Sequence, residues 1–179
     1  KKYCLVLEPA RKNGAIVSAR RGKGNFKLEV KGKAAHSGIE PERGRSAIEE
    51  LAYKIIELHD ITDEEEGINV NVGLIEGGTS ANTISDHAVA QVDVRFRTQE
   101  QAEEIEQWLK EIMANTEVDG TKIRFEGEIN RPPMEKNVQT EKLLRIIKQV
   151  GDDLQLFIKD TETGGASDAS FPSALGVPT

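Results

Sequence analysis

The sequence predicts an α/β fold in which a ferredoxin-like unit is inserted into part of a parallel sheet. Between residues 22 and 130, four segments alternate apolar and polar residues, and two others repeat apolar residues at helical spacing. Their order is strand, helix, strand, strand, helix, strand, which is typical of a four-stranded antiparallel sheet with both helices on one face. We therefore predict a ferredoxin-like domain at 21–131 between two segments, 1–20 and 132–179, of a parallel α/β domain.

The first segment contains one apolar run. Residues 3–7 (Tyr-Cys-Leu-Val-Leu) are followed by Glu8 and Pro9, and such a run is typical of a strand buried on both faces of a parallel sheet. Residues 11–24 are basic, contain glycine and are mostly polar, which indicates a linking segment.

The first half of the predicted insert has three elements. Residues 25–31 alternate and predict a strand that Gly32 stops. Apolar residues recur at helical spacing over 48–56, with Ser46 as the expected N-cap. Strict alternation over 68–74 predicts the second strand.

The second half repeats this arrangement in the same order. A strand is expected at 89–97, an amphipathic helix at 102–113, and a last strand at 123–129 after the turn at 119–120. The Arg-Pro-Pro at 131–133 breaks the pattern and marks the exit from the insert.

The C-terminal segment predicts further pieces of the parallel sheet. An apolar stripe over 143–150 predicts a helix, residues 154–159 a strand, and residues 177–179 the start of another strand. The loop at 163–168 precedes a short helix that ends near Gly176. Because these pieces could not cover the faces of their own sheet, we expect the chain to belong to a longer protein.

Composition excludes several classes of function. The 179 residues carry a net charge of −7, which disfavours nucleic acid as a partner. No run approaches the ~20 apolar residues that a membrane helix requires, so no membrane partner is expected. Cys4 is the single cysteine, which excludes an intrachain disulfide and favours a cytoplasmic location.

Four positions could carry chemistry. Glu8, at the carboxyl end of an expected strand, is a candidate metal ligand or a solvated strand end. His36, in a loop of small residues, could bind metal, move protons or stabilise an oxyanion, or be a surface histidine. Asn82 could serve only its own turn. Arg95 suits bidentate carboxylate binding or a strand-edge ion pair.

The strongest local signal is the loop at 163–168. Gly164 and Gly165 precede Ser-Asp and a short helix, a pattern that exposes backbone N–H groups to an anion or simply forms a capped turn. No two histidines have ligand spacing and no C-x-x-C occurs, so this chain alone cannot assemble the three or four ligands of a zinc site.

Six motifs occur in the order found in a known enzyme family. They are Leu7-Glu8-Pro9, Gly32-Lys33-Ala34-Ala35-His36-Ser37-Gly38, residues 41–47, residues 77–84, Asp93-Val94-Arg95 and residues 163–169. Through them essentially the whole chain resembles the zinc exopeptidase and deacylase family of glutamate carboxypeptidase, acetylornithine deacetylase and succinyl-diaminopimelate desuccinylase. Its Leu-Glu-Pro and Thr-Gly-Gly segments most resemble those of bacterial glutamate carboxypeptidase.

The resemblance implies a catalytic α/β domain with two bridged zinc ions per active site and an inserted lid domain that forms a homodimer. Glu8 matches the carboxylate that ligates one zinc. His36 matches the lid histidine that reaches into the partner subunit's active site and stabilises the oxyanion.

The resemblance also implies how substrate is bound. Asn82 and Arg95 match residues that contact the substrate's carboxylate or the reaction centre, and Gly164 and Gly165 match the loop beside the substrate. The implied substrates are peptides or N-acyl amino acids with a free carboxylate.

The chain departs from the family at several points. The His-x-Asp pair, bridging Asp, Glu-Glu pair and final His, which supply the other zinc ligands and the general base, are absent, and Ser85 stands where many relatives have proline. We therefore expect the dimerisation and lid portion of a two-zinc hydrolase, inactive by itself. A non-catalytic dimerisation module is one alternative. Another is a small-molecule-binding regulatory domain, which explains residues 22–130 but neither Glu8 nor the loop at 163–168.

Overall fold

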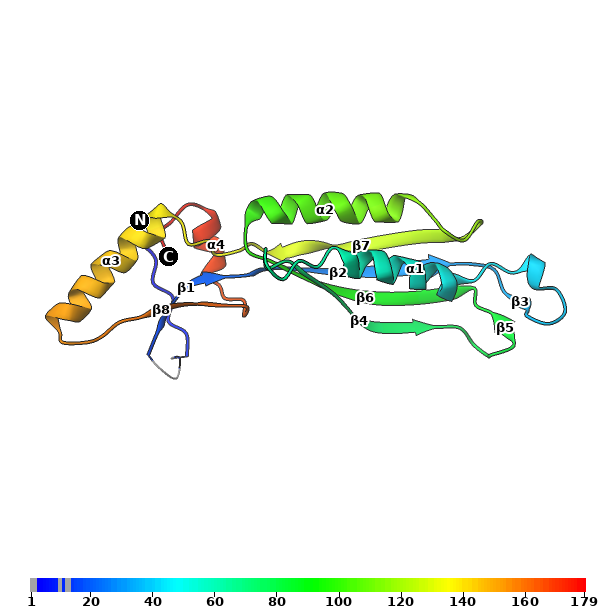
Figure 1. Cartoon of the computed structure of the whole chain (residues 1–179), viewed down its shortest axis with the longest axis horizontal. Coiled ribbons are helices and arrows are strands. Elements are labelled where there is room, and N and C mark those ends of the chain that lie inside the picture. Colours follow the sequence, from blue (N-terminus) through cyan, green and yellow to red (C-terminus); the bar gives the residue numbers. More distant parts are fainter. Residues whose placement is uncertain (1–2, 10, 12–13) are drawn as a thin grey trace. The chain divides into compact units, whose positions relative to one another are not determined.

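A computed structural model describes residues 3–9, 11 and 14–179 (Figure 1). The chain forms two compact units. The insert unit comprises Gly24–Val94 and Glu103–Glu128, and the flanking unit comprises Lys1–Lys23, Arg95–Ala102 and Ile129–Thr179.

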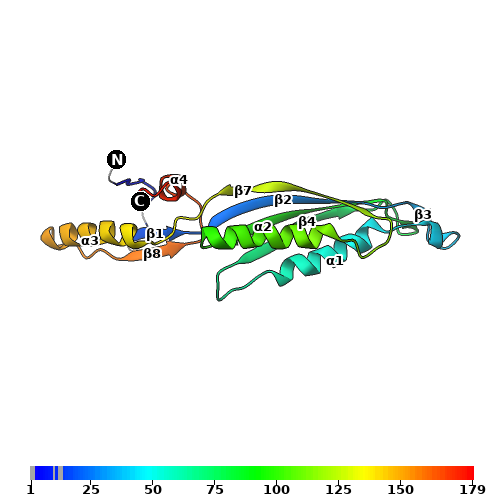
Figure 2. The same ribbon diagram turned by 90° about the horizontal axis from the view of Figure 1, so that it is seen from above.

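The insert unit is built on a four-stranded sheet whose strand order is β4-β6-β2-β7. Helices α1 and α2 lie on the same side of this sheet (Figure 2). The chain order and the sheet order are those of the ferredoxin-like fold, so the predicted fold class is confirmed. The elements are β2 (Gly22–Lys31), α1 (Ala47–Asp60), β4 (Asn69–Gly77), β6 (His87–Phe96), α2 (Gln99–Ala114) and β7 (Lys122–Arg131).

Between the sheet and the helices lies an apolar core. The alternating apolar residues of β2 and β6 point into it, and the two helices contribute leucine and isoleucine. Phe26 of β2 stacks on Phe125 of β7 with ring centroids 5.1 Å apart. The fully buried members are Leu28, Val30, Leu51, Leu58, Val92, Val94, Ile105 and Leu109. Each such side chain contributes about 1.5–3 kcal/mol through burial.

The buried face of α1 differs from the predicted apolar stripe. Glu50 and Lys54 are buried, whereas Ile48 and Ile56 are 47% and 62% exposed. The reason is a polar contact that the sequence pattern does not show, because Glu50 accepts a hydrogen bond from the amide of Val118 at 2.7 Å. The predicted N-cap is confirmed, since the Ser46 hydroxyl accepts from the third residue after it at 3.1 Å.

The loop end of the insert unit carries a second, small sheet. Here β3 (Ala35–His36) pairs antiparallel with β5 (Thr83–Ile84), and the 3-10 helix η1 (Pro41–Arg43) follows β3.

The flanking unit contains a parallel pair of strands. Strand β1 (Ile16–Arg20) lies beside β8 (Asp160–Thr163), with helices α3 (Val138–Asp153) and α4 (Ser170–Ala174) in the same unit. The two ends of the chain therefore share a parallel sheet, as predicted, although the strands lie at other residues. No helix in the part of the chain that the structure describes is long and apolar enough to cross a bilayer.

The first predicted strand was wrong. Residues 3–9 form neither strand nor helix, and Leu7 is 98% exposed. The strand lies instead at 16–20, inside the predicted linking segment. Its buried residues are Ser18 and Arg20, which are polar and find partners in the folded unit, so no apolar pattern marks the strand.

The strand predicted at 154–159 was also wrong. That segment is a turn followed by an extended loop, and Phe157 is 84% exposed. The strand begins at Asp160 and reads Asp-Thr-Glu-Thr, a polar sequence. Residues 177–179 are not a strand either; the Pro178 carbonyl accepts a hydrogen bond from the Cys4 amide at 2.9 Å.

Candidate functional site

The Glu8 carboxylate lies against the loop that follows β8. It accepts a hydrogen bond from the Ser167 hydroxyl, and its Oε1 lies 4.0 Å from Nη2 of Arg20. The Glu8 side chain is 39% exposed, whereas that of Arg20 is only 6% exposed. Two residues 159 positions apart thus meet in one polar cluster of the flanking unit.

Arg20, the last residue of β1, organises this cluster. Its Nη1 donates to the carbonyl oxygens of Gly165 at 3.1 Å and Ala166 at 3.5 Å. Burial lowers the pKa of Arg20 from its ordinary value, and the negative charge of Glu8 opposes that change. The sequence prediction missed Arg20 because residues 11–24 had been assigned to a linking segment; the Arg-Arg-Gly sequence at 20–22 was the available signal.

The two glycines of the loop differ in their surroundings. The Gly165 amide donates to the Thr163 hydroxyl at 3.3 Å, so the loop itself uses that N–H group. A Cβ added to Gly164 would meet no atom within 4 Å. Gly164 therefore faces open space, where another molecule can approach the backbone.

Two cavities adjoin this cluster, and Arg20 lines both. One, of about 350 Å³, is mostly apolar and contains Glu8 and Ser167. The other, of about 400 Å³, contains Gly164 and several charged side chains. Both volumes lie in the range of small-molecule sites.

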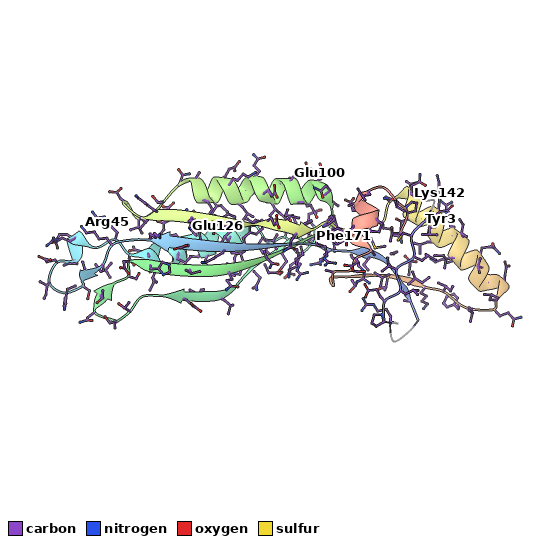
Figure 3. All side chains as sticks on the ribbon, turned by 180° about the vertical axis from the view of Figure 1, so that it is seen from behind. Tyr3, Arg45, Glu100, Glu126, Lys142 and Phe171 are labelled. Carbon is purple, nitrogen blue, oxygen red and sulfur yellow. The ribbon has the colours of Figure 1, made fainter. Side chains whose placement is uncertain are left out.

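His36 and Asn82 come together at the loop end of the insert unit, where Arg45 also lies (Figure 3). His36 pairs with Thr83 in the β3–β5 ladder, and the amide of Ser37 donates to the carbonyl of Asn82 at 3.0 Å. The Nδ1 atom of His36 accepts from the Gly38 amide at 3.1 Å. This bond assigns the proton of the neutral ring to Nε2, which makes the exposed edge of the imidazole a donor.

The Asn82 side chain is held by its own turn. Its Oδ1 accepts from the Ser80 hydroxyl at 2.9 Å, which leaves the NH₂ group as the donor that faces outward. Ser85 is buried and accepts from the Ile48 amide at 2.9 Å. It thereby fixes the loop after Asn82 to the first turn of α1.

Arg95 is half-buried near the end of β6 and belongs to the flanking unit. The predicted site residues therefore form two groups. Glu8, Arg95 and the glycine pair lie in the flanking unit, and His36 and Asn82 lie in the insert unit.

The metal chemistry of this chain is limited. Among residues 3–9, 11 and 14–179 no group of three or more His, Cys, Asp or Glu side chains could hold a metal ion. The immediate partners of Glu8 are a hydroxyl and a guanidinium, and a guanidinium is not a ligand. The described residues do not fit a zinc site by themselves.

Comparison with known proteins gives a consistent result. The family model described as peptidase dimerisation domain matches residues 18–121. The uncharacterised protein YqjE of Bacillus subtilis is 29% identical over 178 residues, which cover 99% of this chain and 47% of that protein. Carboxypeptidase G2 of Pseudomonas sp. is 24% identical over 181 residues, covering 98% and 43%.

A shorter match to a curated protein and a match to a solved structure point to similar enzymes. A probable carboxypeptidase of Uncinocarpus reesii is 39% identical over 103 residues, which cover 50% of this chain and 23% of that protein. The crystal structure of aminopeptidase PepT from Bacillus cereus superposes with a TM-score of 0.82 at 26% identity, over 99% of this chain and 48% of that one. The chain thus spans about half the length of YqjE and of PepT.

Proposed function

Because the chain belongs to the peptidase dimerisation domain family, we propose that it is the self-associating lid portion of a hydrolase. The proposed reaction is hydrolysis of an amide bond next to a free carboxylate, in a peptide or an N-acyl amino acid. One observation carries the proposal: Glu8 and the Gly164–Gly165 loop lie in one cluster, held together by Arg20. The names carboxypeptidase and aminopeptidase among its relatives agree with it.

Self-association is proposed to occur through β4. This strand and β7 form the two edges of the four-stranded sheet. Residues 69–75 of β4 are uncharged, and Leu74 and Ile75 are 61% and 58% exposed. The β7 edge alternates charged residues, which discourages strand pairing.

Sedimentation equilibrium tests this surface. The wild-type chain is expected to form dimers, and Ile75→Lys to shift the equilibrium to monomers, because two lysines would face each other across a two-fold axis. Glu128→Lys on β7 is the control and should leave the dimer intact. Monomers of the wild-type chain at high concentration would contradict the proposal.

In the proposed active site the two groups of residues come from different subunits. Arg95 would bind the substrate's carboxylate with its guanidinium. The Nε2–H group of His36, together with Asn82, would approach from the partner and stabilise the oxyanion. The hydrogen bond that places the His36 proton on Nε2 supports this role. The family resemblance also implies two zinc ions, for which Glu8 is the matched ligand. Since the described residues do not complete that site, the metal chemistry is assigned to the rest of a longer protein.

Mixing two inactive variants of the longer protein tests the division between subunits. Glu8→Ala and His36→Ala are each expected to lose on the order of a hundredfold or more in turnover. If His36 acts in the partner's site, a mixed dimer has one intact and one doubly altered site. Random mixing in equal amounts should therefore restore about a quarter of wild-type activity. No recovery, with mixed dimers demonstrated, would overturn the assignment.

A non-catalytic dimerisation module remains the second candidate for the chain as printed. The absence of a metal-binding group among the described residues favours it. The 179-residue chain with added Zn²⁺ should hydrolyse no N-acyl amino acid. Hydrolysis by this chain would contradict the claim that it lacks the residues needed to complete the zinc site. A cytoplasmic location stays a prediction, which rests on the single Cys4.

A further inference from the structure

The loop that carries His36, residues 36–44, has little packing of its own. Every residue from His36 to Arg43 is exposed. The pairing of β3 with β5 and the hydrogen bond from the Ser37 amide to the Asn82 carbonyl hold only the first residues of this His36 loop. A segment with few buried contacts opens easily, so its order depends on how the rest of it is fixed.

Main-chain atoms close the base of the His36 loop. The amide of Lys33 donates to the carbonyl of Arg45, and the amide of Arg45 donates to the carbonyl of Lys33, each at 2.9 Å. Gly44 is buried against Ile84 of β5, where an added Cβ would collide with the isoleucine side chain. None of these contacts uses the side chain at position 45, so they should persist when that side chain is replaced.

The Arg45 side chain adds a second restraint, on the 3-10 helix η1. Its Nη1 donates to the carbonyl of Glu42 at 2.8 Å and to that of Gly44 at 2.5 Å. Glu42 lies in η1, and the end of a helix leaves such carbonyls without partners inside the helix. A guanidinium only donates and is rigid, so one group can satisfy both carbonyls and fix them relative to each other.

The turn between α2 and β7 supports the stem of Arg45. A Cβ added to Gly120 would lie 3.2 Å from Nε of Arg45 and 3.4 Å from its Cδ, so the stem runs across this turn. The turn is itself anchored to α1, because Glu50 accepts from the amide of Val118 at 2.7 Å. Arg45 therefore braces η1 against a part of the insert unit that is fixed to its core.

η1 is linked to His36 through the turn that precedes it. The His36 carbonyl accepts from the amides of Ile39 and Glu40, both at 3.2 Å. In the same turn the Gly38 amide donates to Nδ1 of the imidazole at 3.1 Å. A displacement of η1 would thus also displace the amide that holds the ring.

We propose that Arg45 is a positioning residue for His36. Its guanidinium holds η1, and the turn before η1 holds the imidazole so that Nε2–H is the free donor. The inference rests on the proposed function in one respect, the role of His36 at the oxyanion. Arg45 itself binds main-chain carbonyls of its own loop and acts only through His36. Such a donor has to be fixed before the reaction starts, because its contribution depends on pre-organisation.

Amide exchange and three-bond couplings in the 179-residue chain test the proposal without any enzyme activity. Arg45→Met keeps an unbranched stem beside Gly120 and removes the guanidinium. The Gly38 amide should then exchange about tenfold faster, and the couplings across χ1 of His36 should show averaging between rotamers. The urea midpoint should stay close to that of wild type, because the main-chain contacts at the base of the loop remain.

Two further variants complete this test. Arg43→Met removes an exposed guanidinium of the same loop, whose partner is the Glu40 carboxylate at 2.9 Å, and should leave Gly38 exchange within about twofold of wild type. Arg45→Lys keeps a charged donor without the fork and should give an intermediate rate. If Arg45→Met leaves Gly38 exchange unchanged, the proposal is wrong. It is also wrong if exchange rises equally throughout the insert unit and the urea midpoint falls, because Arg45 would then stabilise the fold instead of the loop.

Kinetics of the longer protein separate this inference from the proposed function. Arg45→Met should lower kcat about tenfold with little change in KM, because the oxyanion forms only in the transition state. In a His36→Ala background the same change should cause no further loss, and a further loss would overturn the positioning role. Faster Gly38 exchange in the chain with an unchanged kcat would retain the positioning of His36 and remove its proposed catalytic role.

Discussion

Arg20 and Gly165, 145 positions apart in sequence, are joined by a hydrogen bond of 3.1 Å from the guanidinium to the backbone carbonyl. The bond ties the end of β1 to the glycine loop, and the same guanidinium lies 4.0 Å from the Glu8 carboxylate. Three segments of the chain are thus held by one buried side chain.

Replacing Arg20 should therefore destabilise the flanking unit. Arg20→Gln removes a charge-assisted donor from two carbonyls and should cost about 2 kcal/mol in the free energy of unfolding. Urea denaturation measures the change. Arg145→Gln, on the exposed side of α3, is the matched control and should stay within about 0.5 kcal/mol of wild type. If Arg20→Gln is as stable as this control, the hydrogen bonds of Arg20 do not contribute to the free energy of unfolding.

Gly164→Ala should change the KM of the longer protein without changing the stability of the fold. The added methyl group meets no atom within 4 Å, so the melting temperature should stay nearly unchanged. In the longer protein the KM should rise, because the methyl group would occupy the space beside the substrate. Gly151→Ala should show the opposite pattern, since its Cβ would lie 2.7 Å from Cδ1 of Ile158. An unchanged KM for Gly164→Ala would argue against a loop that faces substrate.

Stability should fall in acid because of Asp160. Hydrogen bonds from Lys136, then from Lys148 and Ser18, hold the pKa of this carboxyl well below its ordinary value. The unfolded chain therefore binds a proton at a higher pH than the folded chain does. The stabilisation is complete above the unfolded pKa of about 3.9 and is lost as pH falls toward the folded pKa.

Asp160→Asn should lower the melting temperature at pH 7 and reduce its decline below about pH 4. Asp152→Asn, an exposed carboxylate of α3, is the control and should leave both features as in wild type. Thermal unfolding followed by circular dichroism between pH 2 and 7 provides the measurement. A decline equally steep in Asp160→Asn would assign the acid sensitivity to other groups.

The stability contributed by the buried residues Glu50 and Lys54 of α1 should depend on their charges rather than on their volumes. The side chains of Glu50 and Lys54 are 0% and 1% exposed, with Oε1 and Nζ 4.0 Å apart. Lys54→Met keeps the volume but leaves the Glu50 carboxylate uncompensated, at an expected cost of about 3–5 kcal/mol. Adding Glu50→Gln should recover part of that loss, because a neutral amide can still accept from Val118.

Urea midpoints of the two single variants and the double variant measure this coupling. Glu49→Gln, which removes an exposed charge one residue away on the same helix, should change little. If the losses of the two single variants simply add in the double variant, the pair does not interact.

The insert unit was predictable because its strands are half-buried and its helices amphipathic. Apolar alternation in residues 25–31 shows directly which side of β2 faces the core, and the order of elements limits the topology. The exception is α1, where Glu50 is buried through a bond to a residue 68 positions away. Hydrophobic periodicity contains no information about such a partner.

The flanking unit was less predictable, because the buried positions of β1 are polar and β8 is polar throughout. Ser18 of β1 is buried and donates to Asp160 of β8 across 142 positions, and Asp160 also accepts from Lys136 and Lys148. A pattern that treats polar residues as exposed misses both strands. The same limit hid Arg20, whereas Glu8 and the glycine pair were proposed as site residues through their motifs.

The unequal edges of the four-stranded sheet limit how far assembly can proceed. If two copies join through β4, the pair presents β7 at both outer ends, with its row of Lys122, Arg124, Glu126 and Glu128 and the irregular backbone of Gly127. Charged residues on an edge strand discourage further pairing, so we expect growth of the proposed assembly to stop at two copies. The attraction proposed for β4 would then not continue into filaments.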